Sequence, residues 1–168
     1  IFNITESAHR IHNPFTSEKL ATLGAALRLE RGTRVLDLGS GSGEMLCTWA
    51  RDYGITGVGI DMSQLFSEQA KLRAEELEVS DRVKFILFYS VGYVTEEKVG
   101  VAACIGATWI GGGVAGTIEL LTKSLCTGGI ILIGEPYWRQ LPPTEDVAKA
   151  CHANAVIDFL ILPELLAS

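Results

Sequence analysis

The sequence is short of basic residues. Lys and Arg together number 14 among 168 residues, against 20 Asp and Glu, which gives a formal net charge of −6. A protein whose main partner is nucleic acid needs a basic face for the phosphates, and no cluster of Lys and Arg is present. We therefore expect no nucleic-acid partner.

The sequence also lacks the patterns of a zinc site, a signal peptide and a membrane span. Its cysteines, Cys47, Cys104, Cys126 and Cys151, form no C-x-x-C pair, so we expect no metal and reduced thiols packed in a core. The first residues carry neither a basic start nor the apolar run of a signal peptide. No apolar stretch approaches the roughly 20 residues of a membrane span. These absences predict a cytoplasmic protein without membrane contact.

What the sequence does have is an alternation of short apolar runs with helical patterns. The expected strands are 34–38, 57–60, 83–88, 99–105 and 129–134, and the expected helices are 44–53, 63–78, 117–126, 144–152 and one that begins at 162. Strands that alternate with helices predict a parallel sheet with helices on its faces, in a single domain over 1–168.

Local signals add detail to this outline. Thr16 or Ser17 is expected to cap a helix that buries Leu20, and Ser63 to cap a later one. In that later helix the residues expected to face the core are Leu65, Ala70, Leu72 and Leu77. Residues 106–116 contain five glycines and are expected to form a loop.

A glycine turn follows the first predicted strand, in the run VLDLGSGSG at 35–43. A strand, a tight glycine turn and a helix start are what α/β folds use to hold a nucleotide-like ligand. Glu44 stands where a dinucleotide fold has its third glycine, which disfavours a nicotinamide dehydrogenase. Asp37, near the strand end, can accept a hydrogen bond from an amine. The pattern favours a nucleoside that bears an amino acid over a diphosphate.

A second acid, Asp61, follows the second predicted strand, eighteen residues after Gly43. A carboxylate there can accept hydrogen bonds from both hydroxyls of a ribose, and Met62 can pack on an adenine face. The alternative is that Asp61 only caps the next helix. Because both features lie on successive strand ends, we favour a ligand site.

The runs VLDLGSGSGE, GVGIDMS and LCTGGIILIGEP resemble the class I S-adenosylmethionine-dependent methyltransferases, especially small-molecule enzymes of the ubiquinone/menaquinone-biosynthesis type and bacterial relatives. The resemblance covers nearly the whole chain. It implies a Rossmann-like, doubly wound parallel sheet in strand order 3-2-1-4-5, S-adenosylmethionine as cofactor, and methyl transfer to a small-molecule acceptor. The family's fold continues with a helix and two more strands, so the resemblance also predicts that the chain is truncated.

The resemblance assigns a cofactor site and a domain plan. The implied cofactor-binding residues are Asp37, Gly39, Ser40, Gly41 and Gly43 at the methionine, Asp61 and Met62 at the ribose and adenine, Tyr89 and Ser90 facing the adenine, and Cys104 and Ile105 at the sulfonium. The implied plan is an N-terminal lid and helix at 1–31, a cofactor-binding core at 32–135, and the start of an acceptor-side region at 136–168.

One position departs from the family pattern. Such enzymes usually carry an acid after the third strand to bind the adenine amine, and here Phe88, Tyr89 and Ser90 occupy that place. This departure leaves open a second interpretation, that the chain is a non-catalytic module that binds S-adenosylmethionine.

Methyl transfer from a sulfonium is an in-line displacement, so alignment and exclusion of water matter most. Glu135, at the tip of the fifth strand, can orient an acceptor or act as a base, or it can be simply solvated. Tyr137, Trp138 and Trp109 can wall an acceptor pocket, with core packing as the alternative for each. His9 and His12, ahead of the first helix, can act as a base, or they can be ordinary surface or hydrogen-bonding residues.

Overall fold

The chain divides into two compact units, unit 1 over Ile1–Gly134 and unit 2 over Glu135–Ser168. The structure is a computed structural model, and it describes residue 11, residues 15–151 and residues 153–167. The single domain over 1–168 and its subdivision at 31 and 135 stay predictions.

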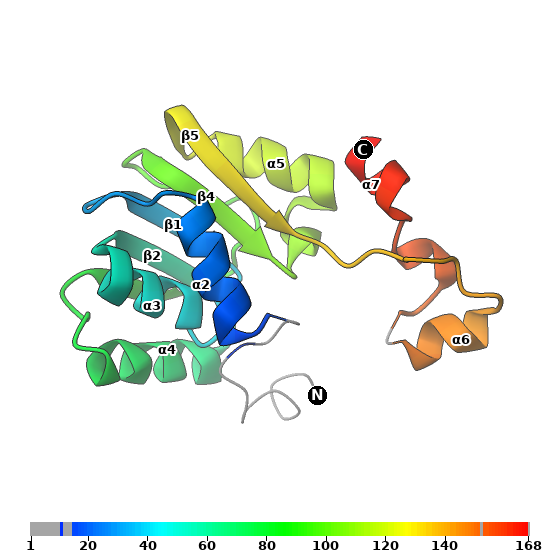
Figure 1. The fold of residues 1–168 in the computed structure, drawn as a ribbon, viewed down its shortest axis with the longest axis horizontal. Helices are drawn as coiled ribbons and strands as arrows, with labels where there is room; N and C mark the ends of the chain where they lie inside the picture. The colour runs from blue at the N-terminus through cyan, green and yellow to red at the C-terminus, as the bar shows by residue number, and fades with distance from the viewer. Residues whose placement is uncertain (1–10, 12–14, 152, 168) are drawn as a thin grey trace. The chain divides into compact units, whose positions relative to one another are not determined.

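Unit 1 is built on a five-stranded sheet in the order β3-β2-β1-β4-β5, with neighbouring strands parallel (Figure 1). The strands are β1 Arg34–Leu38, β2 Thr56–Asp61, β3 Val83–Leu87, β4 Val99–Ile105 and β5 Leu125–Gly134. The predicted sheet and strand order are confirmed. β5 starts earlier than expected because Leu125 already pairs with Val99; the register then shifts, and Val101 pairs with Ile130.

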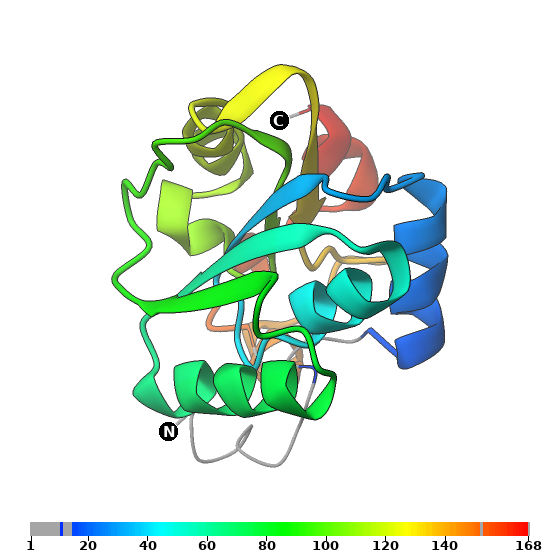
Figure 2. The ribbon, with the colours of Figure 1, turned by 90° about the vertical axis from the view of Figure 1, so that its left-hand side faces the viewer.

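Helices cover both faces of this sheet (Figures 1 and 2). The helices α2 Ser17–Ala26, α3 Glu44–Tyr53 and α4 Gln64–Glu76 contribute to one core cluster, whereas η1 Thr108–Gly111 and α5 Val114–Thr122 contribute to the other. Side chains alternate across a strand, so Val35 of β1 joins the first cluster and Leu36 joins the second. The doubly wound arrangement is therefore confirmed.

The predicted helix starts are confirmed by their caps. Thr16 Oγ1 accepts a hydrogen bond from Lys19 N, and Ser63 Oγ accepts one from Phe66 N, each at 3.3 Å. Each cap pairs one backbone N–H that has no partner within its helix. Leu20 in α2 is buried as expected.

The core face of α4 differs from the prediction. Ala70 is buried and Leu77 packs, partly buried, against the first core cluster as expected, but Leu65 and Leu72 are exposed. The buried positions are instead Phe66, Ser67, Ala70 and Ala74. Phe66, Ala70 and Ala74 form an i, i+4, i+8 stripe with Ser67 beside it, and Leu65 and Leu72 lie outside this stripe.

The glycine-rich stretch 106–116 is not a plain loop, because η1 and the first turn of α5 lie within it. Thr117 Oγ1 donates to Thr108 O at 2.8 Å and joins the two. A Cβ on Gly116 would lie 2.1 Å from Gly111 O, so this glycine serves a close approach rather than a flexible link.

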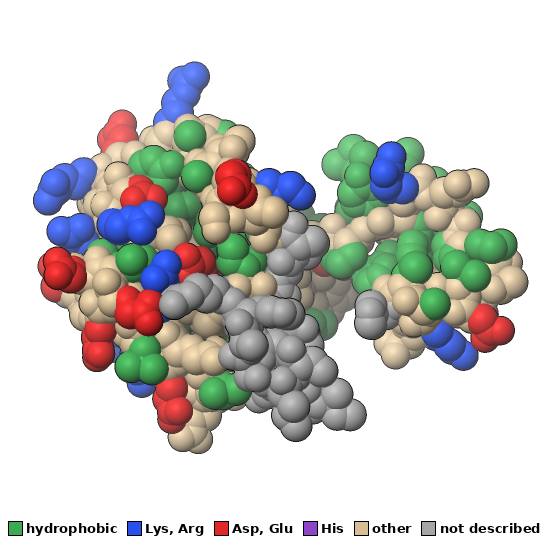
Figure 3. Space-filling model, turned by 60° about the horizontal axis from the view of Figure 1, so that its bottom comes forward, with side chains coloured by type: hydrophobic (Ala, Val, Ile, Leu, Met, Phe, Trp, Pro, Cys, Tyr) green, Lys and Arg blue, Asp and Glu red, His purple; other side chains and the backbone are tan. Residues whose placement is uncertain are grey.

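Unit 2 is organised by Trp138. It contains α6 Glu145–Ala150, η2 Val156–Asp158 and α7 Leu162–Ala167. Trp138 N donates to Leu160 O and its Nε1 donates to Val156 O, both at 2.8 Å, and its ring packs edge-on against Phe159. Figure 3 shows many hydrophobic side chains on the visible face of this unit, in keeping with exposed Leu141, Ile157 and Leu166.

Gly43 combines a left-handed backbone with a crowded environment. Its φ is +74°, and a Cβ there would lie 2.6 Å from the Phe85 ring and 2.8 Å from Ala70 Cβ. Gly92 has nearly the same φ, +73°, but no atom within 4 Å of the corresponding position.

We therefore predict that Gly43→Ala destabilises the protein more than the matched variant Gly92→Ala. Backbone strain alone should cost about 1–2 kcal/mol in either variant, and overpacking against Phe85 should add about 1–3 kcal/mol for Gly43→Ala. Urea denaturation measures both losses. Equal losses would contradict the close packing of the turn.

Candidate functional site

A pocket of about 410 Å³ opens at the carboxyl ends of the unit 1 strands. Residues at or just after the ends of β1, β2 and β4 line it, among them Gly39, Ser40, Gly41, Ser42, Asp61, Met62 and Gly106. Pockets of this size hold small molecules, and open α/β sheets bind their ligands at this edge.

The glycine turn forms one wall and is held between the neighbouring strands. Gly39 N and Ser40 N donate to Ile60 O at 2.8 and 3.1 Å. On the other side, a Cβ on Gly39 would lie only 2.7 Å from Ala107 Cβ. The φ values of Gly39 and Gly41, +75° and +54°, are also costly for other residues. The turn therefore depends on glycine for both conformation and space.

Asp61 connects the turn to the start of α4. Its Oδ2 accepts from Gly41 N and its Oδ1 accepts from Ser63 N, each at 2.8 Å. Asp61 therefore has a structural role near the start of α4, as the alternative interpretation of the sequence expected. Each carboxylate oxygen keeps further acceptor capacity, and Asp61 lines the pocket. Binding of a ribose by Asp61 stays a prediction.

Asp37 is a buried acid that lines the pocket. Its side chain is 5% exposed, and no described residue hydrogen-bonds to it. Burial, and then the nearby charge of Asp61, raise the pKa of Asp37 to about 8. Asp37 is therefore mostly protonated at neutral pH when the pocket holds no ligand.

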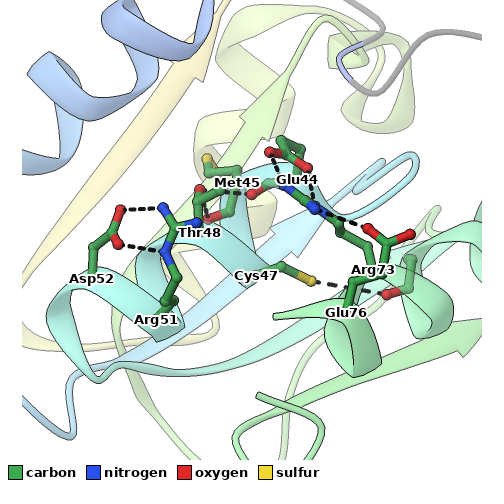
Figure 4. A network of polar contacts seen from close by, with 9 residues as sticks. Glu44, Met45, Cys47, Thr48, Arg51, Asp52, Arg73 and Glu76 are labelled. Atoms are coloured by element: carbon green, nitrogen blue, oxygen red, sulfur yellow. Dashed lines mark hydrogen bonds and ion pairs between the residues drawn. The ribbon is translucent and has the colours of Figure 1, made fainter. Parts of the chain in front are cut away.

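Glu44 also lines the pocket and is held by an ion pair (Figure 4). Its two carboxylate oxygens accept from Arg73 Nε and Nη2 at 2.7 and 2.9 Å, and Arg73 Nη1 donates to Glu76 at 2.9 Å. The pair joins α3 to α4, and its hydrogen bonds raise the pKa of Arg73. No local sequence pattern signals a contact between residues so far apart.

Cys47 lies beside this network and is not set up as a nucleophile. Burial, and then Glu44, raise the pKa of its thiol to about 12. Cys104 is also buried, whereas Cys126 and Cys151 are exposed. The expectation that all four thiols pack in the core is therefore wrong for the last two.

The structure separates the predicted cofactor residues into two groups. Asp37, Gly39, Ser40, Gly41, Asp61, Met62, Ser90 and Ile105 line the pocket. Gly43 instead faces Phe85, and the Cys104 side chain lies in the core because side chains alternate along β4.

Tyr89 is the remaining member, and it is not among the residues that line the pocket. It is 56% exposed, and its ring lies 6.3 Å from that of Trp109. Trp109, predicted as a possible pocket wall, does line the pocket.

Sequence reasoning missed much of the apolar wall. Its members are Ile11, Phe15, Leu20, Met45, Phe66, Ala107 and Ile110. Leu20 was recognisable only as a core residue of an amphipathic helix. Which core residues border a cavity depends on how helices pack, and no local pattern encodes that.

The three predicted catalytic residues are not placed at this pocket. Glu135 and Tyr137 belong to unit 2, whose placement relative to unit 1 is not determined. His12 lies outside the described residues. The catalytic roles of all three stay predictions.

Two features are absent from the described part of the chain. No group of three or more His, Cys, Asp or Glu lies close enough there to hold a metal ion. None of the helices described is both long and apolar enough to cross a membrane.

Comparison with known proteins adds a family and close relatives. A family model described as mycolic acid cyclopropane synthetase matches residues 10–103. The chain is 69% identical over 166 residues to the protein YjhP of Escherichia coli K12, covering 99% of this chain and 67% of that protein.

Two solved structures are similar over the same extent. One is a SAM-dependent methyltransferase from Geobacter sulfurreducens in complex with S-adenosyl-L-homocysteine, at 79% identity and a TM-score of 0.96. The other is a SAM-dependent methyltransferase from Thiobacillus denitrificans with the same ligand, at 76% identity and a TM-score of 0.94. In each comparison 99% of this chain matches 67% of the relative.

The buried Asp37 generates a prediction about stability and pH. A raised pKa means that the folded protein keeps a proton that the unfolded chain has released between pH 3.8 and about 8. The free energy of unfolding should therefore fall as pH rises through this window, by about 1.4 kcal/mol per pH unit for this one group.

Asp37→Asn stays neutral and should remove this dependence. Calorimetry without ligand measures the difference in Tm between Asp37→Asn and wild type. This difference should favour Asp37→Asn more at pH 8 than at pH 5. Glu119→Gln changes an exposed acid on α5 and serves as the control, with no such trend. A difference for Asp37→Asn that does not change with pH would contradict the shifted pKa.

Proposed function

Because the chain belongs to the class I S-adenosylmethionine-dependent methyltransferases, we propose that it transfers a methyl group to a small-molecule acceptor by in-line displacement. The observation that carries this proposal is that the glycine turn, Asp37 and Asp61 line one pocket at the strand ends.

The pocket residues fit S-adenosylmethionine, which supplies an activated methyl group on a sulfonium. The glycine turn presents backbone to the methionine portion without side chains in the way. Asp37, a buried acid with no partner among the described residues, suits the α-ammonium group. Asp61 accepts hydrogen bonds from the ribose hydroxyls while it keeps the hydrogen bond from Gly41 N. Ile105 borders the sulfonium.

The adenine is held by packing in this proposal. Met62 and Trp109 line the pocket and are both more than half exposed, so each has surface to cover a planar ring. Among the described lining residues, the acids are Asp37, Glu44 and Asp61, and none follows β3. Ser90 is the pocket residue that follows β3, and its Oγ lies 3.5 Å from Ile60 O.

The pocket lining also bears on the acceptor. The described lining residues include no Lys, Arg or His, and most of the wall is apolar. Such a wall favours an apolar, uncharged portion of a small molecule over a phosphate-bearing one. The net charge of −6 likewise disfavours nucleic acid.

Three residues are proposed to act on the acceptor. Glu135 orients it or takes up its proton, Tyr137 contributes to its pocket, and His12 is a second candidate base. In-line displacement needs a base only when the acceptor must lose a proton.

The second candidate function is a binding module that no longer transfers methyl groups. The absence of an acid after β3 among the described pocket residues favours it. It predicts cofactor binding without methyl transfer, so the two functions are separable by experiment.

We predict that Asp61→Ala weakens binding of S-adenosylhomocysteine by about 1.5–3 kcal/mol, the value of a charged hydrogen bond. Asp61 also holds Gly41 N, so analogues are needed to isolate the ribose contact. Wild type should bind S-adenosylhomocysteine at least about tenfold more tightly than its 2′-deoxy analogue, and Asp61→Ala should lose this preference.

Calorimetric titration measures these affinities, with NAD titrated in parallel. A preference for the ribose form that survives in Asp61→Ala would remove Asp61 from the ribose role. If titration with NAD produces binding heat and titration with S-adenosylhomocysteine produces none, the cofactor assignment is contradicted.

Transfer of label from S-adenosylmethionine with a radioactive methyl group tests the activity itself. After incubation with a cell extract, label should enter the small-molecule fraction and not the protein or nucleic-acid fractions. Glu135→Gln should reduce transfer by about 10²–10⁴-fold, the range for general acid–base groups, with cofactor binding unchanged. Glu164→Gln, a change elsewhere in unit 2, is the matched control.

The outcomes of this assay discriminate between the two functions. Cofactor binding without transfer to any fraction would favour the binding module. Label in the macromolecular fraction would contradict a small-molecule acceptor. Full transfer by Glu135→Gln would exclude Glu135 as the base.

A further inference from the structure

The pocket contains more acidic side chains than its described residues can pair. Three acids line it: Asp37, Asp61 and Glu44. Glu44 is paired with Arg73, which also binds Glu76. Asp61 is stabilised by two backbone N–H groups. Asp37 has neither a cation nor a hydrogen-bond donor among the described residues.

We propose that Asp37 is a proton-exchanging carboxyl, neutral in the pocket without ligand and ionised when the α-ammonium group of the cofactor binds beside it. The proton leaves the carboxyl oxygen for solvent, and the ammonium group donates to the carboxylate that remains. This inference rests on the proposed function.

The physical reason lies in the burial of Asp37 and its proximity to a second acid. Burial, and then repulsion from Asp61, hold the pKa of Asp37 at about 8. A cation within hydrogen-bonding distance favours the ionised form of a carboxyl. In a site of low effective dielectric that attraction is stronger than in water. Binding of an ammonium group should therefore lower the pKa of Asp37 below neutrality.

The charged groups of the described pocket lining, together with the partner of Glu44, come from three elements. Asp61 ends β2, Glu44 begins α3, and Arg73 of α4 pairs with Glu44. Of these, Asp61 is the one whose charge shifts the pKa of Asp37. The described lining contributes no other titratable side chain.

The exchange gives the pocket a means to select its ligand. A nucleoside that carries an ammonium group gains a charge-assisted hydrogen bond to Asp37. A neutral nucleoside leaves Asp37 protonated and gains none. The pocket would therefore discriminate the amino-acid-bearing cofactor from other adenosine derivatives through one carboxyl group.

Calorimetry of the full chain at pH 7 in buffers of different ionisation enthalpy counts the protons released. S-adenosylhomocysteine should release close to one proton from wild type. 5′-Methylthioadenosine, which has the same nucleoside thioether without the ammonium group, should release none. Asp37→Asn should release none with S-adenosylhomocysteine, whereas Glu119→Gln, changed at an exposed acid on α5, should behave as wild type.

A second measurement on wild type alone avoids dependence on the folding of Asp37→Asn. The affinity for S-adenosylhomocysteine should increase about tenfold between pH 6 and pH 7, and level off above about pH 8. The affinity for 5′-methylthioadenosine should not follow this trend.

The outcomes separate this inference from the proposed function. Binding of S-adenosylhomocysteine without proton release, or with release that persists in folded Asp37→Asn, would overturn the role of Asp37 alone. No binding of S-adenosylhomocysteine at all would overturn the cofactor assignment and this inference with it.

Discussion

The close approach of the glycine turn to its neighbours is the constraint on which the rest of unit 1 depends. Gly39 lies against Ala107 after β4, and Gly43 lies against Phe85 of β3. Between them, Gly41 N donates to Asp61 at the end of β2. One turn thus fixes the ends of several strands relative to one another. The pocket exists because backbone occupies positions that side chains would otherwise fill.

The acids around this turn differ in whether a cation pairs with them. Glu44 is neutralised by Arg73 and joins α3 to α4, so its charge supports the architecture. Asp37 has no such partner among the described residues, and burial keeps it protonated. A buried acid that is left unpaired weakens the fold at alkaline pH, but it leaves a position that a cationic ligand can complete. The two acids therefore have different roles within one pocket.

Strong local signals allowed much of this to be predicted. Strand 34–38 and helix 44–53 were predicted with the bounds that the structure shows, because an apolar run, three glycines and an amphipathic helix follow one another directly. Side-chain orientation was harder to predict. The exposure of Leu72 and Tyr89 and the burial of Cys104 depend on the packing of each element against its neighbours. Such packing cannot be predicted from the sequence of a short segment alone.

The sequence by itself determined the fold class, the strand order through its family resemblance, the glycine turn and the two acids that border the pocket. These features are encoded by residues that are adjacent or repeat with a fixed period, so local physics suffices. Only the tertiary structure decided that Asp37 lacks a described partner, that Arg73 neutralises Glu44, and that Phe15 and Met45 wall the pocket. Burial and pairing arise between residues distant in sequence, so they exist only once the chain has folded.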